Sequence, residues 1–354
     1  MYILLAILAF CILIISHELG HFLAARACGV RVLEFAMGMG PVLWKKQSGE
    51  TLYSLRLLPV GGFCAMEGED ETSDDPRAFN NQSRWKRIII LISGALMNFV
   101  VGFLLILLLF SQAGGFWAPV VTDFAEGCPY EGEYGLQEGD QIWRINGKRI
   151  YFVSNISLYA SRSAQEGVVD IELIRDGEKV LLEDYQFVPL DYTQEDGNVV
   201  RQYGLLFGEL ESGVWAKLKY SWYRAVDFVR LVWVSLTDLV TGSVGVQDMS
   251  GVVGIVGIIS ETGQAAESVR IALEDIAYLV SFIAINLAVM NLLPIPALDG
   301  GRVFGLLITA VIETILRRRL DPKYEGYIHT AGFALLMGLM AVVAYNDIVR
   351  LVQR

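Results

Sequence analysis

The segment "SHELGH" at residues 16–21 directly follows an apolar run that carries no charged side chain. Two imidazoles and a carboxylate are costly inside hydrocarbon, and they mark functional sites when they lie there. A membrane helix needs roughly 20 predominantly apolar residues. The run and the segment together predict a helix over residues 2–24 that carries His17, Glu18 and His21 into a membrane.

The rest of the chain has the composition of a membrane protein with several spans. Of its 354 residues 54% are hydrophobic, and the mean hydropathy is +0.45. Three further apolar segments, residues 88–110, 276–293 and 328–345, are candidates for membrane helices. The formal charge of −11 argues against nucleic acid as a partner, because no basic surface would neutralise phosphates. We therefore expect an α-helical polytopic membrane protein with four transmembrane helices in contact with lipid.

The distribution of basic residues predicts the sidedness of these helices. The loop between the first two spans carries Arg26, Arg31, Lys45, Lys46, Arg56, Arg77, Arg84, Lys86 and Arg87. The connection before the last span carries Arg302, Arg317, Arg318, Arg319 and Lys323. Both should stay in the cytoplasm, which places both termini and the acid-rich residues 111–270 outside the cell membrane. A cleaved signal peptide is the disfavoured alternative, because no basic residue precedes the first apolar run.

Three segments outside the spans have patterns of their own. Residues 32–44 and 51–58 are strand-like and are separated by turn-forming residues 45–49, which predicts a cytoplasmic, membrane-associated β-hairpin. Residues 222–240 combine charges with tryptophans in an apolar background, which is typical of an amphipathic helix on a membrane surface. Residues 303–316 are too few to cross a membrane, so a buried or interfacial helix is favoured.

The segment "YGLQEGDQIWRINGKRI" lies in the long outer region. Residues 141–145 alternate as a strand does, and Asn146-Gly147 is a strong type I′ hairpin turn. A second turn is expected at Asp176-Gly177. The pattern resembles a PDZ domain, a fold that binds peptide C-termini by adding a strand to its sheet. An unrelated small β-domain with the same turn is the alternative.

The two histidines of the first span predict a metal site. Four residues apart on a helix, His17 and His21 project from one face, and Glu18 beside them can act as a general base, an arrangement that binds Zn²⁺ in metalloproteases. Asp299, near the cytoplasmic end of the third span, lies at a matching depth and is the expected third ligand. The alternatives are that the two histidines and the glutamate only hold helices together, and that Asp299 only caps a helix or forms a turn.

Polar and helix-breaking residues near the expected metal site are candidates for binding substrate. Pro294 and Pro296 interrupt the third span and free backbone groups with which a substrate strand could pair. Asn286 and Asn291 add amides at a similar depth, where buried amides need partners. Asn98 in the second span either contacts substrate or joins that span to its neighbours.

Taken together, these motifs resemble the site-2 protease family of intramembrane zinc metalloproteases, and within it the bacterial RseP-like branch. The segments that carry the resemblance are "HELGHFLAARACGVRVLEFAMGMGP", "LPVGGFCAMEGE", "SGALMNF", "NLLPIPALDGGRVF" and "YNDIVRL". They extend over nearly the whole chain. The resemblance implies a metalloprotease core of transmembrane helices with an extracytoplasmic PDZ domain (α+β) inserted after the second. This chain has room for one such domain, where the family often has two.

The resemblance also implies roles for residues and partners. His17, His21 and Asp299 would be the zinc ligands with Glu18 as the base, and the two asparagines of the third span would help hold an unwound substrate helix. Family members cut single-span membrane proteins, such as anti-sigma factors that an upstream site-1-type protease has already trimmed, and some clear remnant signal peptides. The PDZ domain would bind peptide C-termini or exclude untrimmed substrates. We therefore expect a membrane-embedded zinc endopeptidase with its active site toward the cytoplasm.

The expected order of parts follows from these assignments. It runs through transmembrane helix 1 with the zinc motif (1–25), the cytoplasmic loop with the hairpin (26–87), transmembrane helix 2 (88–111), the PDZ domain (112–208), amphipathic juxtamembrane helices and a loop (209–270), transmembrane helix 3 with the Asn/Pro/Leu-Asp-Gly motif and a following helix (271–326), and transmembrane helix 4 with the tail (327–354). Two other functions are the alternatives to proteolysis. A metal transporter would usually have repeated halves, which the sequence lacks, and a catalytically silent scaffold would not need the His-Glu-His set.

Overall fold

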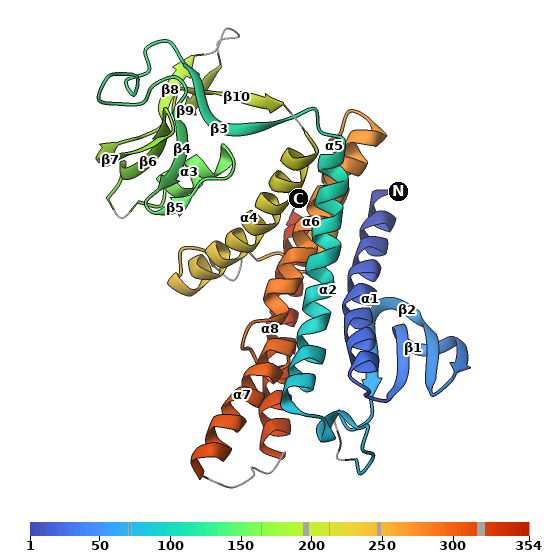
Figure 1. Ribbon diagram of the computed structural model, residues 1–354. Coiled ribbons are helices and arrows are strands. Elements are labelled where there is room, and N and C mark those ends of the chain that lie inside the picture. The colour runs from blue at the N-terminus through green and yellow to red at the C-terminus, as the bar shows by residue number, and fades with distance from the viewer. Residues whose placement is uncertain are drawn as a thin grey trace. The chain divides into compact units, whose positions relative to one another are not determined.

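The chain is described by a computed structural model that covers residues 1–69, 71, 73–163, 165–193, 198–211, 213–245, 249–316 and 323–353 (Figure 1). It divides into two compact units, one formed by Met1–Leu109 with Phe228–Arg354 and the other by Phe110–Asp227. Within these described ranges, four helices are long and apolar enough to cross a membrane: α1 (Tyr2–Ala27), α2 (Arg84–Ser111), α6 (Val269–Asn291) and the Thr330–Arg350 part of α8 (Lys323–Gln353). The chain is therefore an integral membrane protein, with β-structure in both units.

The first two spanning helices pack closely enough for their backbones to touch. A Cβ atom placed on Gly20 of α1 would lie 2.2 Å from the carbonyl oxygen of Ser93 in α2. Small residues at such crossings are how membrane helices gain close van der Waals contact. On the other side, Val101 of α2 packs against a cluster that contains Ile283 and Ala284 of α6. The second span thus bridges the first and third, which brings the two expected halves of the metal site together.

A short apolar helix, α5 (Val252–Ala265), lies where only amphipathic helices and a loop were expected. Its 14 residues are too few to cross a membrane. Ile259 packs into the cluster that α1 and α6 share. Asp347 of α8 is buried, and its Oδ2 accepts hydrogen bonds from the backbone nitrogens of Gly251 (3.0 Å) and Gly254 (2.9 Å). The aspartate therefore caps α5 from another helix.

The expected β-hairpin is present, with longer strands than the pattern indicated. Strand β1 spans Val32–Ser48 and β2 spans Thr51–Met66. The expected turn over residues 45–49 is wrong, because pairing continues until Ser48 lies opposite Thr51. A two-residue turn joins the strands instead. Lys, Gln and Ser suit an exposed strand end as well as a turn, so their composition alone did not separate the two.

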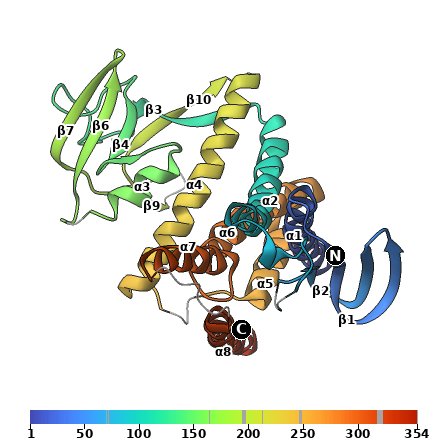
Figure 2. The same ribbon diagram turned by 60° about the horizontal axis from the view of Figure 1, so that its bottom comes forward.

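The last part of β2 returns along the other edge of β1. Phe35 pairs with Tyr53 on one side and with Cys64 on the other, so β1 begins as the middle of three strand segments. This sheet packs on α1, where the rings of Phe22 and Phe35 lie 5.2 Å apart within a cluster that also contains Met66. Figures 1 and 2 show the hairpin beside the C-terminal half of α1. The return segment therefore passes near the histidines.

The third span is interrupted where the prolines predict it. Helix α6 ends at Asn291, and α7 (Asp299–Leu316) begins after a short irregular segment. That segment holds Pro294 and Pro296, which cannot continue a helix. The expected helix over residues 303–316 therefore exists but begins four residues earlier. Asp299 becomes the first residue of α7, where a carboxylate is favourable to the helix dipole.

The second unit is a small β-rich body. Its elements are β3 (Gly115–Phe124), β4 (Gln141–Ile145), β5 (Lys148–Arg149), α3 (Ser154–Ala160), β6 (Val168–Arg175), β7 (Glu178–Gln186), β8 (Leu190–Thr193), β9 (Val199–Gln202) and β10 (Leu205–Glu211). The main sheet has the order β10-β3-β4-β6-β7, and β5 pairs with β4. Both expected turns are confirmed, with φ of 47° at Asn146 and 70° at Gly147, and 51° at Asp176 and 85° at Gly177.

A buried ion pair fixes the loop that precedes β4. Asp140 is fully buried, and its carboxylate accepts hydrogen bonds from Arg175 at 2.8 and 2.7 Å and from the backbone nitrogen of Gln137 at 2.8 Å. The aspartate of the Gly-Asp pair in the PDZ-like pattern therefore stabilises the loop before β4. The PDZ assignment itself stays a prediction. Helix α4 (Val214–Thr241) contains the expected amphipathic segment and is longer than residues 222–240.

Candidate metal centre

Three side chains converge at one point between α1, α2 and α7. The four-residue spacing on α1 places His17 and His21 side by side, and α7 begins with Asp299 next to them. Oδ2 of Asp299 lies 3.2 Å from Nε2 of His17 and 3.3 Å from Nε2 of His21, and the two Nε2 atoms are 3.2 Å apart. Among the described residues, these three form the one group of histidine, cysteine and carboxylate side chains placed to share a metal ion.

Hydrogen bonds on the far side of each ring orient the imidazoles. Nδ1 of His21 lies 2.8 Å from the carbonyl oxygen of Ile90 in α2. A carbonyl can only accept, so Nδ1 of His21 carries a hydrogen, and in the neutral ring Nε2 then keeps its lone pair. Nδ1 of His17 lies 3.4 Å from the side-chain amide of Asn291. The nearer amide atom is the nitrogen Nδ2, and turning the amide by 180° would bring its oxygen to Nδ1 and give His17 the same tautomer. Such partners are the usual support of metal-binding histidines.

The donor set fits a zinc ion. Ligands about 2.0–2.1 Å from a tetrahedral zinc lie roughly 3.3 Å from one another, which matches the three distances between Asp299, His17 and His21. Oδ2 of Asp299 is buried and has no hydrogen-bond donor among the described residues. With a lone pair on Nε2 of His21, two acceptor atoms would face each other at contact distance. A cation between them resolves that repulsion.

Gly94 of α2 makes room for both rings. A Cβ atom at this position would lie 2.3 Å from Nε2 of His21 and 2.8 Å from Cε1 of His17. Contacts this short force one or both imidazoles to move, or force α2 to give up its close packing on α1 at Gly20. The metal geometry therefore depends on a missing methyl group in a neighbouring helix.

We expect Gly94→Ala to weaken zinc binding by at least about tenfold, because misplacing an imidazole costs at least as much as losing its outer hydrogen-bond partner. Competition with a chromophoric chelator measures this. Gly338→Ala is the matched control, since a Cβ there meets no atom within 4 Å and should leave zinc affinity unchanged. Equal zinc affinity in Gly94→Ala and the parent protein would contradict the geometry.

A cavity of about 580 Å³ opens beside the three ligand atoms. Its walls come from α1, from the return segment of β2 with the residues that follow it, from the break before α7 and from the first turn of α7. Glu18 lines it next to both histidines. Cys64 lines it too, and burial raises the pKa of this thiol, with the Glu18 and Glu69 carboxylates raising it further. Cys64 is not among the three side chains whose ligand atoms lie close enough together to share a metal ion.

Of the expected substrate-binding residues near the third span, only some line the cavity. Asn291 lines the cavity. Asn286 precedes it by five residues, which is about 140° around a helix, and it is not among the described residues that line the cavity. Pro294 and Pro296 form the break beside Ala297, which lines the cavity and has a φ of 80°. The substrate roles of these residues stay predictions.

Asn98 is buried away from the cavity wall. It is 1% exposed, and its Oδ1 accepts a 2.7 Å hydrogen bond from Oγ of Ser16. This contact joins α2 to α1, as expected for polar residues that hold membrane helices together. The contact fits the second of the two roles that the sequence left open for this residue, and the substrate role of Asn98 stays a prediction.

Several features of the site carry no clear signal in the sequence. The carbonyl of Ile90 is backbone, and its role arises from how α2 crosses α1. Gly94 is visible only as part of the Gly-x-x-x-Asn motif, which does not show what the glycine accommodates. Glu69 and Arg302 also line the cavity, although their charges alone indicate only a polar loop and a cytoplasmic helix end.

Comparison with known proteins agrees with this geometry. A family model described as peptidase family M50 matches residues 5–339. A protein of Clostridium perfringens (strain 13 / Type A) named as a zinc metalloprotease is 36% identical over 350 residues, or 99% of each chain. One of the same description from Clostridium acetobutylicum is 38% identical over 349 residues, covering 98% of this chain and 97% of the other. The regulator of sigma-W protease RasP of Bacillus subtilis (strain 168) is 28% identical over 427 residues, covering 98% and 97%.

Proposed function

This chain belongs to peptidase family M50, the site-2 proteases, and is an intramembrane zinc metalloprotease; we propose that it hydrolyses peptide bonds within, or at the edge of, the transmembrane segments of single-span membrane proteins. The observation that carries the proposal is the convergence of His17, His21 and Asp299 within an apolar bundle. Burying these three polar side chains inside a membrane costs free energy. A substrate whose peptide bond lies at the same depth in the membrane gives a reason for that cost.

We propose that Nε2 of His17, Nε2 of His21 and Oδ2 of Asp299 hold the zinc. When bound, zinc polarises a carbonyl oxygen and makes a water molecule acidic enough to yield a nucleophile near neutral pH. Three protein ligands leave a fourth position open, as catalytic zinc sites require. The carbonyl of Ile90 keeps His21 in the tautomer that ligates. Asn291 would do the same for His17 with its amide turned so that the oxygen faces Nδ1.

Glu18 is the proposed general base. It follows His17 directly on α1, so its side chain leaves the helix in a different direction from the two histidines. It lines the same cavity as they do. Its carboxylate takes a proton from the attacking water and returns it to the leaving nitrogen. The return segment of β2 lies over it, since a Cβ on Gly62 would be 3.5 Å from Cγ of Glu18.

The substrate must unwind before it can react. A helix keeps its carbonyls in internal hydrogen bonds, and freed backbone groups inside a membrane need new partners. The break between α6 and α7 offers irregular backbone beside the cavity, and Asn291 offers an amide. We propose that these groups, with Pro294, Pro296 and Asn286 shaping the same segment, hold the unwound stretch.

The sidedness and partners belong to the same proposal. We place the active site toward the cytoplasm and both termini outside, because the basic residues cluster in the loops after α1 and before α8. RasP is named as a regulator of sigma-W protease, which supports anti-sigma factors as one substrate class. We propose that a site-1-type protease trims them first. Remnant signal peptides are another. The second unit would act as the PDZ domain that binds peptide C-termini or excludes untrimmed proteins.

Removing the metal tests the proposed function directly. We expect purified protein in lipid vesicles to cleave a single-span reporter, to lose all measurable cleavage after treatment with a chelator, and to regain it with added Zn²⁺. Mass spectrometry of the fragments should place the cut within, or at the edge of, the apolar segment. Cleavage that survives zinc removal, or cuts confined to the soluble part of the reporter, would contradict the proposal.

A further inference from the structure

The cavity beside the candidate zinc ligands contains an ion pair that the proposed hydrolysis does not use. Nη1 of Arg302 donates to Oε1 of Glu69, and both side chains line the cavity. They are 32% and 17% exposed, so the pair is partly shielded from solvent. Among the described residues that line this cavity, Arg302 is the one with a permanent positive charge.

Arg302 lies where its charge does not help its own helix. It is in the first turn of α7, three residues after Asp299, so the two side chains share a helix face. A cation near a helix N-terminus opposes the helix dipole. The arginine is therefore stabilised by an anion in the cavity, and in the resting protein that anion is the carboxylate of Glu69.

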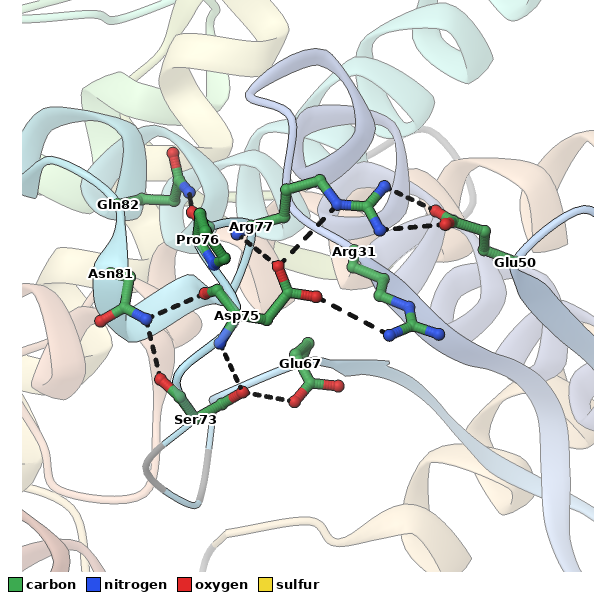
Figure 3. Close-up of polar contacts among 9 residues, drawn as sticks. All are labelled: Arg31, Glu50, Glu67, Ser73, Asp75, Pro76, Arg77, Asn81 and Gln82. Atoms are coloured by element: carbon green, nitrogen blue, oxygen red, sulfur yellow. Dashed lines mark hydrogen bonds and ion pairs between the residues drawn. The ribbon is translucent and has the colours of Figure 1, made fainter.

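Glu69 is carried by a segment that other contacts hold in place (Figure 3). Just before it, Oε1 of Glu67 accepts a 2.6 Å hydrogen bond from Oγ of Ser73. Farther along, Arg77 makes two hydrogen bonds to Glu50 at the hairpin turn, at 2.8 and 2.9 Å. Residues before and after Glu69 are therefore anchored by contacts that do not involve Arg302. The Arg302 guanidinium can therefore exchange the Glu69 carboxylate for another without releasing the segment.

The proposed hydrolysis creates a new carboxylate near Arg302. The peptide C–N bond breaks, the oxygen of water bonds to the acyl carbon, and a proton goes to the leaving nitrogen. One fragment then ends in a new carboxylate beside Asp299, about one helical turn from Arg302. A carboxylate in a partly apolar cavity costs free energy unless a cation pairs with it. A guanidinium is well suited, because it can bind a carboxylate through two parallel hydrogen bonds.

We propose that Arg302 forms a binding subsite for a peptide α-carboxylate, and that Glu69 occupies this subsite until the new C-terminus of the cleaved substrate displaces it. The proposal rests on the proposed function, because that reaction supplies the carboxylate. Glu69 thus serves as an internal competitor. It keeps the arginine neutralised in the resting enzyme and gives the product a path away from the zinc.

Direct binding of a product-like peptide tests the subsite. The protein is the full chain with Glu18→Gln, so that no peptide is consumed, and the probe is a short fluorescent apolar peptide made with either a C-terminal carboxylate or a C-terminal amide. Anisotropy gives Kd with zinc bound and after chelation. We expect the carboxylate peptide to bind at least about tenfold more tightly than the amide in both states, as for a charge-assisted hydrogen bond.

Three variants in this background assign the preference to its residues. Arg302→Gln should bind both peptides equally, and Arg302→Lys should keep part of the difference. Glu69→Gln should bind the carboxylate peptide several-fold more tightly than the parent, because the competitor is gone. Arg84→Gln is the matched control, since it removes another ion pair to α7, with Glu313, that lies outside the cavity. It should keep the full preference.

Several results of these binding measurements would contradict the proposed subsite, each for a different reason. Equal binding of both peptides to the parent, or a preference that survives Arg302→Gln, would overturn the subsite. A preference that disappears on chelation would assign the carboxylate to zinc and also overturn it. Should Arg302→Gln fail to fold, Glu69→Gln decides, and unchanged carboxylate binding there counts against the proposal. Wild-type protein that cleaves its reporter but shows no carboxylate preference would leave the proposed function intact.

Discussion

Replacing Glu18 by glutamine is expected to leave zinc and substrate bound and to slow cleavage by about 10²–10⁴-fold, the usual contribution of a general base. Glutamine has nearly the same shape as glutamate but cannot take the proton of the attacking water. The three proposed ligands, His17, His21 and Asp299, are untouched. Single-turnover cleavage of a membrane reporter, together with the zinc content of the purified variant, measures both parts of this prediction.

The matched control for this variant is Glu313→Gln. Glu313 is also a partly shielded carboxylate, 18% exposed and paired with Arg84, but it lies outside the cavity. Its replacement should leave the cleavage rate within about twofold of wild type, as expected for a surface ion pair. Normal cleavage by Glu18→Gln would remove the assigned base. Loss of zinc from that variant would instead make Glu18 part of the metal site.

Replacing Asp299 by asparagine is expected to weaken zinc binding by more than about 100-fold, because loss of a ligand exceeds the 10–100-fold effect of losing an outer partner. The amide is neutral and leaves two imidazoles to hold a divalent cation. Cleavage should fall in parallel and recover partly at high zinc concentration. Competition with a chromophoric chelator gives the affinity, and the reporter assay gives the activity at each zinc concentration.

Asp347→Asn controls for the loss of a buried carboxylate in the same unit. Asp347 caps α5 and is 2% exposed. Its amide counterpart keeps an oxygen that can accept one of those hydrogen bonds. This variant should bind zinc as wild type does. Wild-type zinc affinity in Asp299→Asn would mean that the carboxylate near the histidines is not a ligand.

The sequence predicted the parts of the fold that depend on composition and local chemistry. Apolar length located the four spanning helices, although α6 begins seven residues before the predicted start of the third span. Asn146-Gly147 located a turn whose two positive φ values the structure contains. The approach of Asp299 to the histidines also followed from sequence. Matching depth in the membrane and the Pro294–Pro296 break restrict where that aspartate can lie.

What the sequence did not show depends on contacts between distant segments. The carbonyl of Ile90 and the space left by Gly94 acquire meaning only once α2 crosses α1. Helix α5 is held by a cap from Asp347, almost a hundred positions further along the chain. The hairpin turn was placed too early because exposed strand ends and turns share polar residues.

X-ray absorption at the zinc edge of the purified, membrane-reconstituted protein measures the proposed coordination most directly. The geometry of His17, His21 and Asp299 predicts two imidazole nitrogens and light oxygen ligands about 2.0–2.2 Å from the metal, with no sulfur. His21→Ala should remove one imidazole from the spectrum or abolish zinc binding. A sulfur ligand near 2.3 Å, or an unchanged imidazole count in His21→Ala, would contradict a zinc site built from these three side chains.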